Sequence, residues 1–212
     1  MPYSRADMAA RAAADIPEGW VVNLGIGMPT AIADHVPLER EVIFQSENGV
    51  IGMGPAPAPD KVNPWLINAG KQVITLRPGG SYVHHADSFA MIRGGHIDLC
   101  VLGGFEVAEN GDLANWATSE NDSAPAVGGA MDLGAGAKRL WVIMDHTTKD
   151  GRPKLVPECG YPLTALRAVT RVYTNLGVFD VTAKGFVVVD LAPGVTLEQA
   201  QAASAAKLHT ST

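Results

Sequence analysis

The sequence predicts an α/β fold, a single open α/β/α domain over residues 1–212 with a largely parallel sheet and a C-terminal hairpin plus helix. Apolar segments of strand length alternate with helical segments through the first two thirds of the chain, which is typical of parallel α/β sheets. The last third instead holds two apolar runs joined by a turn, followed by a helix. With 47% hydrophobic residues, the 212-residue chain can form a sizeable core.

The expected elements begin with an alanine-rich helix. Ser4 and Asp7 form a capping box that should start a helix of about three turns, and the sequence PEGW at 17–20 should end it. The elements expected next are a strand at 21–26, a helix at 28–36 and a strand at 40–44. The last of these strands leads directly into Ser46 and Glu47.

The same alternation continues through the middle of the chain. The elements expected there are a strand at 72–76, a helix at 84–95, a strand at 97–104, a helix at 128–137 and a strand at 140–145. Residues 176–191 read as a hairpin that turns at Lys184-Gly185. Thr196 and Gln199 then form a capping box for a closing helix at 196–208. The proline-dense segment 54–64 is expected to be a stiff surface loop.

Composition limits the classes of function. The net charge is -6 and is spread along the chain, so nucleic-acid binding has no electrostatic support. Cys100 and Cys159 offer neither a metal site nor a disulfide framework. We expect no signal peptide, and no apolar run approaches the ~20 residues of a membrane helix. A cytoplasmic protein that contacts no membrane is the resulting expectation.

The tripeptide Glu-Asn-Gly occurs twice, at 47–49 and at 109–111. At the second site the alternation of polar and apolar residues predicts a two-residue hairpin with Glu109 in solvent. At the first, Gly52, Gly54 and the prolines after them follow too closely for a strand. Glu47 should therefore sit where a strand gives way to a loop, the end of an α/β sheet where ligands bind. The alternative is an inert, solvated glutamate.

Several other features leave two interpretations open. Residues 23–30, NLGIGMPT, lack the third glycine of a dinucleotide fingerprint, so a dinucleotide site is not expected there. Either the backbone of this loop approaches some other ligand, or its glycines form a tight structural turn. Gly128 and Gly129 open a helix. Their free amides could bind an anion or an oxyanion, or the two glycines could be needed only because a side chain would not fit. Lys71 could hold a phosphate or lie in solvent. The adjacent His84 and His85 lack metal-site spacing and are expected to be structural or exposed.

Six segments in order resemble the β subunit of class I 3-oxoacid coenzyme A transferases. They are SENGVIGMGP, LINAGK, SFAMIRGGHIDLCVLGGFEV, NGDLANW, VGGAMDLGAGAKRLWVIMDH and TKDGRPKLV. The similarity starts at NLGIGMPT and extends to GFVVVDLAPG, so it covers nearly the whole chain and implies that family's α/β fold over residues 1–212. The stretch ATSENDSAP at 117–125 departs from the family pattern and implies a change in local loop length.

The resemblance also implies roles for individual residues. Glu47 would be the covalent nucleophile, which favours the first Glu-Asn-Gly over the second. Gly129 would present its amide to an oxyanion. The adjacent Gly128 would be a substrate-binding position. The remaining substrate-binding positions are Asn23 and Lys71 along the coenzyme A path, and Gly103 and Gly104 near the thioester.

The implied reaction moves coenzyme A from succinyl-CoA to a 3-oxoacid, with 3-oxoadipate favoured over acetoacetate. It would proceed by ping-pong catalysis through a glutamyl-CoA thioester, with CoA thioesters as substrates and neither a permanent cofactor nor a metal. Arg93 is either part of a pocket for the distal carboxylate or a solvated helix-end residue. The implied partner is an α subunit, in a heterodimer or an α2β2 heterotetramer. The alternative functions are a sugar-phosphate isomerase with Glu47 as general base, and a metabolite-sensing domain.

Overall fold

The computed structural model describes residues 1–119 and 126–210. Its helical elements are α1 (Arg5–Asp15), η1 (Met28–His35), η2 (Pro59–Lys61), α2 (His85–Arg93), α3 (Ala130–Gly136) and α4 (Leu197–Ala202). The strands of its large sheet are β1 (Val21–Leu24), β2 (Ile43–Ser46), β3 (Val50–Gly54), β4 (Thr75–Tyr82), β5 (Leu99–Leu102), β8 (Leu140–Ile143), β10 (Val169–Thr174), β11 (Gly177–Thr182), β12 (Gly185–Leu191) and β13 (Leu208–Thr210). The strands of a small second sheet are β6 (Glu106–Ala108), β7 (Leu113–Ala114) and β9 (Leu155–Val156).

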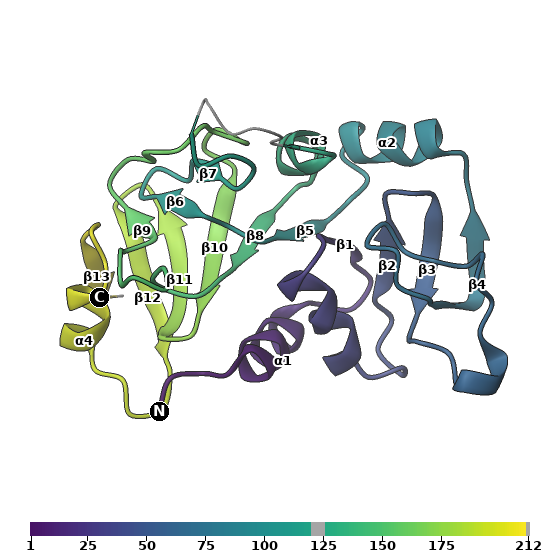
Figure 1. Ribbon diagram of the computed structural model, residues 1–212, viewed down its shortest axis with the longest axis horizontal. Coiled ribbons are helices and arrows are strands. Elements are labelled where there is room, and N and C mark those ends of the chain that lie inside the picture. Colours follow the sequence, from purple (N-terminus) through teal and green to yellow (C-terminus); the bar gives the residue numbers. More distant parts are fainter. Residues whose placement is uncertain (120–125, 211–212) are drawn as a thin grey trace.

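The large sheet has a parallel centre and mixed edges (Figure 1). Its strand order is β13-β12-β11-β10-β8-β5-β1-β2-β3-β4, and every pair from β10 to β2 is parallel. On one side β3 and β4 continue it antiparallel, and on the other side β11 and β12 do so. The predicted α/β fold with a largely parallel sheet and a C-terminal hairpin is therefore confirmed.

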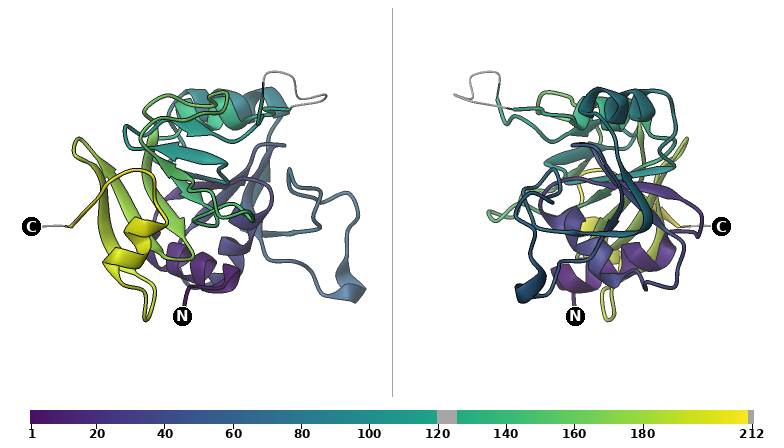
Figure 2. Two further views of the ribbon diagram at one scale, coloured as in Figure 1. Left: turned by 60° about the vertical axis from the view of Figure 1, so that its left-hand side comes forward. Right: turned by 90° about the vertical axis from the view of Figure 1, so that its right-hand side faces the viewer.

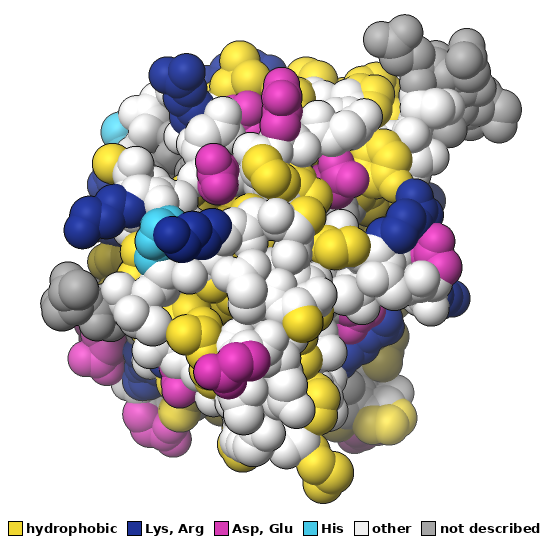
Figure 3. All heavy atoms as spheres, turned by 90° about the vertical axis from the view of Figure 1, so that its left-hand side faces the viewer, with side chains coloured by type: hydrophobic (Ala, Val, Ile, Leu, Met, Phe, Trp, Pro, Cys, Tyr) yellow, Lys and Arg dark blue, Asp and Glu magenta, His cyan; other side chains and the backbone are white. Residues whose placement is uncertain are grey.

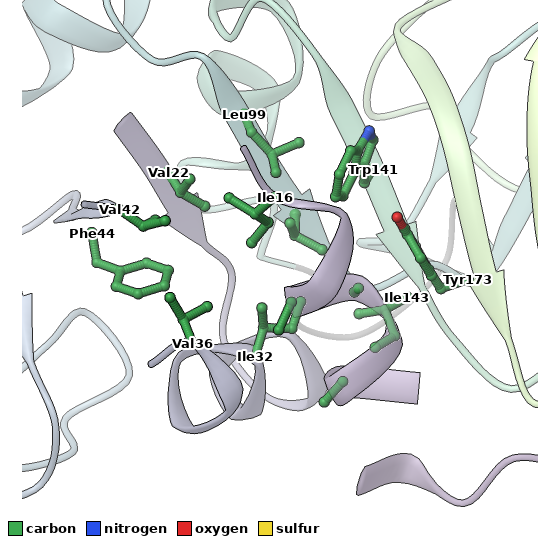
Figure 4. Close-up of a cluster of buried hydrophobic side chains, with 14 of the residues drawn as sticks. Ile16, Val22, Ile32, Val36, Val42, Phe44, Leu99, Trp141, Ile143 and Tyr173 are labelled. Carbon is green, nitrogen blue, oxygen red and sulfur yellow. The ribbon is translucent and has the colours of Figure 1, made fainter. Parts of the chain in front are cut away.

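The central strands bury both faces, as parallel strands do. Along β5, Leu99 and Val101 belong to one hydrophobic cluster, while Cys100 and Leu102 belong to another. The first cluster lies against α1 and η1, and Figure 4 shows side chains from both helices packed on the sheet. The second cluster includes residues of α2 and α3, which lie on the opposite side from α1 (Figure 2). This is the predicted α/β/α layering.

The chain after Glu47 differs from the sequence prediction. Residues 50–54 form strand β3, paired with both β2 and β4, although Gly52 and Gly54 had indicated a loop. Gly52 has a φ of 80°, and a Cβ added there would lie 2.9 Å from the Cα of Gly80. The register shifts at this point between Ile51 and Met53. Glycine here marks a bulge and a close backbone approach, which a strand accommodates.

Other boundaries differ as well. The closing helix ends at Ala202, and Leu208–Thr210 form β13 beside β12 instead of a last helical turn. Pairing with the sheet outweighs the helix propensity of the alanine-rich stretch. Residues 28–35 form a 3-10 helix, the strand expected at 72–76 begins at Thr75, and the 54–64 loop contains the short η2. Both predicted capping boxes are present.

The second Glu-Asn-Gly lies in a hairpin between β6 and β7, as predicted, but the loop has four residues, 109–112. Glu109 is half-buried there and not fully in solvent. Of the departing stretch 117–125, residues 120–125 lie outside the described residues.

Surface charge and hydropathy carry little functional information. On the face shown in Figure 3, side chains of both signs are interspersed with apolar ones. Within residues 1–119 and 126–210, every helix is too short or too polar to cross a bilayer.

Candidate active site

A cavity of about 430 Å³ lies where β2, β1, β5 and β8 end. These are carboxyl ends of neighbouring parallel strands, the usual ligand-binding edge of an open α/β sheet. Six of the seven site residues expected from sequence line it: Asn23, Glu47, Gly103, Gly104, Gly128 and Gly129. Residues separated by more than a hundred positions in the chain therefore meet in one place.

Glu47 lies at the tip of the β2–β3 turn, and neighbouring segments fix that turn. The Gly49 amide donates to the Ser46 carbonyl at 2.9 Å, and Gly49 has a φ of 109° that favours glycine. The Ser46 hydroxyl accepts from the Ala69 amide at 2.9 Å, and the Asn48 side chain donates to the Ile67 carbonyl at 2.7 Å. The loop at 67–69 thus holds the turn that carries the glutamate.

The Glu47 carboxylate is pressed against Gly129. A Cβ added to Gly129 would lie 2.5 Å from Oε2 of Glu47 and 3.0 Å from the ring of Phe89, so no side chain fits there. The Gly129 amide donates no hydrogen bond to any residue within 1–119 or 126–210. Glycine therefore brings an unused backbone donor into the neighbourhood of the carboxylate.

Burial dominates the electrostatics of Glu47. Desolvation raises the pKa of this carboxyl, the charge of Asp132 raises it further, and His85 opposes both. A carboxylate that has lost part of its hydration is a more reactive base or nucleophile than one in water. Its position at the end of a cavity makes it the strongest candidate for chemistry among the described residues.

A buried network of polar side chains lies beneath the turn. The Asn23 amide donates to Oε1 of Gln45 at 2.6 Å, and Gln45 donates to the Ser88 hydroxyl at 2.6 Å. The register places Asn23 beside Gln45 on one strand and beside Cys100 on another. Burial, reinforced by the charge of Glu47, raises the pKa of the Cys100 thiol, which therefore stays protonated. The network links β1, β2 and α2 directly below the glutamate.

Sequence analysis identified Asn23 but missed Gln45 and Ser88. The available signal was a polar residue inside each apolar strand, at Asn23 in VVNL and at Gln45 in IFQS. Asn23 is only 2% exposed, so its side chain mainly serves this network although it borders the cavity.

Gly103 and Gly104 differ in their surroundings. A Cβ added to Gly103 would meet no atom within 4 Å, whereas one at Gly104 would lie 2.9 Å from Val142 and 3.0 Å from Met144. The Asn115 side chain donates to the Gly103 carbonyl at 3.0 Å, which holds this backbone at the cavity wall. A side chain at position 104 would collide with β8 and the residue after it, so packing requires glycine there. A side chain at position 103 would meet only open space.

Lys71 does not line the cavity. It is exposed, has a φ of 63°, and sits in a tight turn in which its amide donates to the Asn68 carbonyl. Ala69, two residues earlier, is the part of this turn that borders the cavity. The structure therefore places Lys71 beyond the rim, near the site but outside its wall.

The remaining charged candidates lie elsewhere. Arg93 is exposed and forms an ion pair with Asp132 at 2.7 Å, so the helix-end interpretation of this arginine is correct. His84 caps α2 by accepting from the Ala86 amide, and His85 packs against Phe89. Within 1–119 and 126–210 no three His, Cys, Asp or Glu residues cluster as a metal site would require. Sequence analysis missed the polar lining residues Asn115, Asp145 and Lys154.

A desolvated carboxylate at the carboxyl ends of parallel strands, beside a glycine amide that no described residue accepts from, is an arrangement typical of α/β enzymes. A family model described as "Coenzyme A transferase" matches residues 5–203. The chain therefore belongs to the coenzyme A transferase family, and it is an enzyme of the transferase class.

Curated relatives agree with this assignment. The chain is 54% identical over 205 residues to the B subunit of 3-oxoadipate CoA-transferase from Pseudomonas putida, covering 97% of this chain and 96% of the relative. It is 50% identical over 189 residues to the B subunit of succinyl-CoA:3-ketoacid coenzyme A transferase from Helicobacter pylori, covering 89% and 90%. A human mitochondrial succinyl-CoA:3-ketoacid coenzyme A transferase is 46% identical, and the match covers 85% of this chain but 35% of the human protein.

Solved structures show the same fold at low sequence identity. An acyl-CoA transferase from Escherichia coli O157:H7 superposes with a TM-score of 0.76 at 20% identity, over 99% of this chain and 42% of that chain. The chain thus spans less than half of that protein. Glutaconate coenzyme A-transferase from Acidaminococcus fermentans superposes with a TM-score of 0.72 at 16% identity, over 98% and 86%.

Proposed function

We propose that this chain transfers coenzyme A from succinyl-CoA to a 3-oxoacid, with Glu47 as the covalent nucleophile. The observation that carries the proposal is the contact between the Glu47 carboxylate and Gly129 inside the cavity. The names of the curated relatives, which include succinyl-CoA:3-ketoacid transferases, support the substrate class. Neither the sugar-phosphate isomerase nor the metabolite-sensing alternative receives support from the family match.

The proposed chemistry conserves the thioester and needs no external energy source. The Glu47 carboxylate attacks the succinyl-CoA carbonyl, which forms a mixed anhydride and releases the CoA thiolate. The thiolate attacks the glutamyl carbonyl, which releases succinate and leaves a glutamyl-CoA thioester. The acceptor acid attacks that thioester and the two steps run in reverse, which regenerates Glu47 in a ping-pong cycle.

The surroundings of Glu47 suit this chemistry. A carboxylate is a weak nucleophile toward a thioester, so desolvation that raises its pKa also raises its reactivity. Each tetrahedral intermediate carries an oxyanion, and the unused Gly129 amide is the donor we assign to it. One such donor stabilises the transition state by about 3 kcal/mol. The hydrogen bonds of Ser46, Asn48 and Gly49 hold the backbone that carries Glu47 at the cavity.

The rest of the proposed site binds coenzyme A and the acyl group. Gly103, Gly104 and Gly128 would lie beside the thioester, with Asn23 behind it. Lys71 lies outside the cavity, so we assign it to a remote part of coenzyme A. CoA thioesters are substrates in this scheme, and no permanent cofactor takes part.

An α subunit would complete the enzyme, in a heterodimer or an α2β2 heterotetramer. Bacterial relatives that match along most of their length are named as B subunits, while the human relative is much longer than this chain. The proposed location is the cytoplasm. The free thiols of Cys100 and Cys159 agree with that reducing compartment.

Among acceptors we favour 3-oxoadipate over acetoacetate. The bacterial relatives named for 3-oxoadipate are 54% and 51% identical to this chain, and the bacterial relatives named for succinyl-CoA:3-ketoacid transfer are 50% and 49% identical. The measurement that decides is kcat/KM for each acid with succinyl-CoA, on the complex reconstituted with its α subunit. Equal values or a preference for acetoacetate would reject the 3-oxoadipate assignment.

Trapping the intermediate tests the mechanism itself. The reconstituted complex is incubated with succinyl-CoA, digested, and analysed by mass spectrometry with and without borohydride reduction. We expect a CoA adduct on the peptide that contains Glu47, converted to a reduced residue by borohydride. Turnover without any adduct on that peptide would rule out the glutamyl mechanism.

A further inference from the structure

Lys154 is the one basic residue among the described residues that line the cavity. Its side chain is half-buried, yet its ammonium forms no hydrogen bond or ion pair with any residue in 1–119 or 126–210. A partly desolvated charge without a partner is unfavourable unless an anion is bound beside it. The cavity wall thus carries a cation that no described residue binds directly.

The nearest carboxylate of the cavity is already paired. Asp145 lines the cavity close to Lys154, and its charge opposes the fall in the pKa of Lys154 that desolvation causes. Asp145 instead forms an ion pair with Arg5 at 3.2 Å. Lys154 is therefore not needed to neutralise Asp145 and is available to an external anion.

The backbone of Lys154 is held in place. Its amide donates to the His146 carbonyl at 3.1 Å, and its carbonyl accepts from the Val107 amide at 2.9 Å. The buried His146 ring is bonded to Thr174 and to Ser204 at 2.9 and 2.8 Å. These contacts anchor Lys154 between the end of β8 and the small sheet, so its position does not depend on a mobile loop.

Lys154 and Glu47 line the cavity beside strands that are not neighbours in the sheet. Glu47 follows β2 and Lys154 lies beside the end of β8, with β1 and β5 between them. Three strand spacings of ~4.8 Å separate their backbones by roughly 14 Å. A separation of this size matches the combined reach of a glutamate, a lysine and an acyl group of a few carbon atoms between them.

We infer that Lys154 binds the distal carboxylate of a dicarboxylic acyl group while Glu47 reacts with its other end. This rests on the proposed function and extends it to specificity. The succinyl group and 3-oxoadipate both carry such a carboxylate, so one cation would serve donor and acceptor. Acetoacetate has a methyl group at that position and gains nothing from the lysine. Arg93, the other candidate cation, is paired with Asp132 outside the cavity.

The test compares Lys154→Met, Lys154→Arg and the matched control Lys149→Met in the reconstituted complex. Lys149 lies in the same segment and is exposed. For Lys154→Met we expect kcat/KM for 3-oxoadipate to fall roughly 10- to 100-fold, as expected for the loss of a charged hydrogen bond. The kcat/KM for acetoacetate, measured with pre-formed glutamyl-CoA enzyme, should change less than about threefold. Lys154→Arg should recover part of the loss, and Lys149→Met should match the wild type.

The outcomes separate this inference from the proposed function. Suppose that wild type forms the Glu47 adduct, but Lys154→Met loses the same activity with both acids or loses none with either. The carboxylate subsite is then refuted, and the proposed function stands. If wild type forms no adduct, the proposed function and this inference fall together. Should Lys154→Met not fold, as judged by circular dichroism, Lys154→Gln takes its place in the same comparison.

Discussion

The two Glu-Asn-Gly turns have the same three residues and opposite surroundings. Glu47 follows a strand of the parallel sheet, faces the cavity, and touches the position where a Gly129 side chain would be. Glu109 follows the short β6 of the small sheet, lies outside the cavity, and has the turn glycine Gly185 next to it. The tripeptide specifies a turn in both cases. Its position in the sheet decides whether the glutamate can meet a substrate.

Distant segments hold both turns, but through different groups. The first turn is tied through the Ser46 and Asn48 side chains to the loop at 67–69. The second is tied mostly through its backbone: the Glu109 amide donates to the Val156 carbonyl, and the Gly111 carbonyl accepts from the amides of residues 168 and 169. Long-range support is therefore common to both turns, and the position of Glu47 at the cavity is what distinguishes it.

Removing each carboxylate gives the largest expected contrast. Glu47→Gln keeps the shape of the side chain but removes the proposed nucleophile, so transfer should fall by more than about 10⁴-fold. Glu109→Gln should stay within about twofold of wild type. Both are measured as steady-state transfer by the reconstituted complex. A Glu109→Gln variant as inactive as Glu47→Gln would show that the two turns do not differ in the way proposed.

A smaller loss is expected from filling the space beside the first glutamate. Gly129→Ala puts a methyl group 2.5 Å from the present position of Oε2 and must displace Glu47. We expect kcat to fall roughly 10²- to 10³-fold, the scale seen when an oxyanion donor or its geometry is lost.

The matched control for that variant is Gly160→Ala. Its added methyl group would lie 3.7 Å from Glu106, an ordinary contact, so activity should be unchanged. Full activity of Gly129→Ala would mean that this contact has no catalytic importance.

The buried network should matter more for stability than its counterpart in the second turn. Ser88 is 0% exposed, and Ser88→Ala leaves the Gln45 amide without its acceptor. The free energy of unfolding should fall by about 1–3 kcal/mol. Asn110→Ala, in the exposed turn, should cost less than about 1 kcal/mol. Urea denaturation at equal protein concentration measures both, and equal losses would contradict the assigned difference.

The subtlest expected difference is in the pH dependence of stability. Desolvation raises the pKa of Glu47 in the folded state, so folding is favoured by its protonated form. That contribution is complete below the unfolded-state pKa of about 4.3 and is lost as pH rises through the folded-state pKa. Glu47→Gln should therefore raise the melting temperature relative to wild type at pH 7, and the gain should shrink toward pH 4.

Glu109→Gln is the control for this measurement as well. Thermal scans of the two variants and wild type across that pH range make the comparison. A gain for Glu47→Gln that stays constant with pH would show that burial of the charge is not its cause.

The sequence predicted the fold correctly because its signals are local, and six of the seven expected site residues line one cavity. Apolar strands, capping boxes and the Gly-Gly at 128–129 are all readable within a few residues. The expected strand-end position favoured Glu47 over Glu109, and the resemblance then singled it out.

What sequence reasoning missed depends on distant contacts. Gly52 can lie within strand β3 because the backbone at Gly80 comes so close that no side chain would fit. Nothing near Gly52 in the sequence shows this approach. Likewise Gln45 and Ser88 become partners only when α2 packs on β2. Lys154 reads as an ordinary lysine until the end of β8 brings it to the cavity. The sequence left Arg93 open between a pocket and a helix-end role because its partner Asp132 is 39 positions away.

The cavity wall is assembled from chain segments between residues 23 and 154, and this has a consequence for folding. Its strands pair in parallel, and each parallel pair needs a crossover connection, so the contacts that form the wall are far apart in sequence. Contacts of this kind form slowly compared with local ones. During synthesis Glu47 leaves the ribosome long before β8 and Lys154, so it is part of an unfinished sheet until the C-terminal half of the chain has been made.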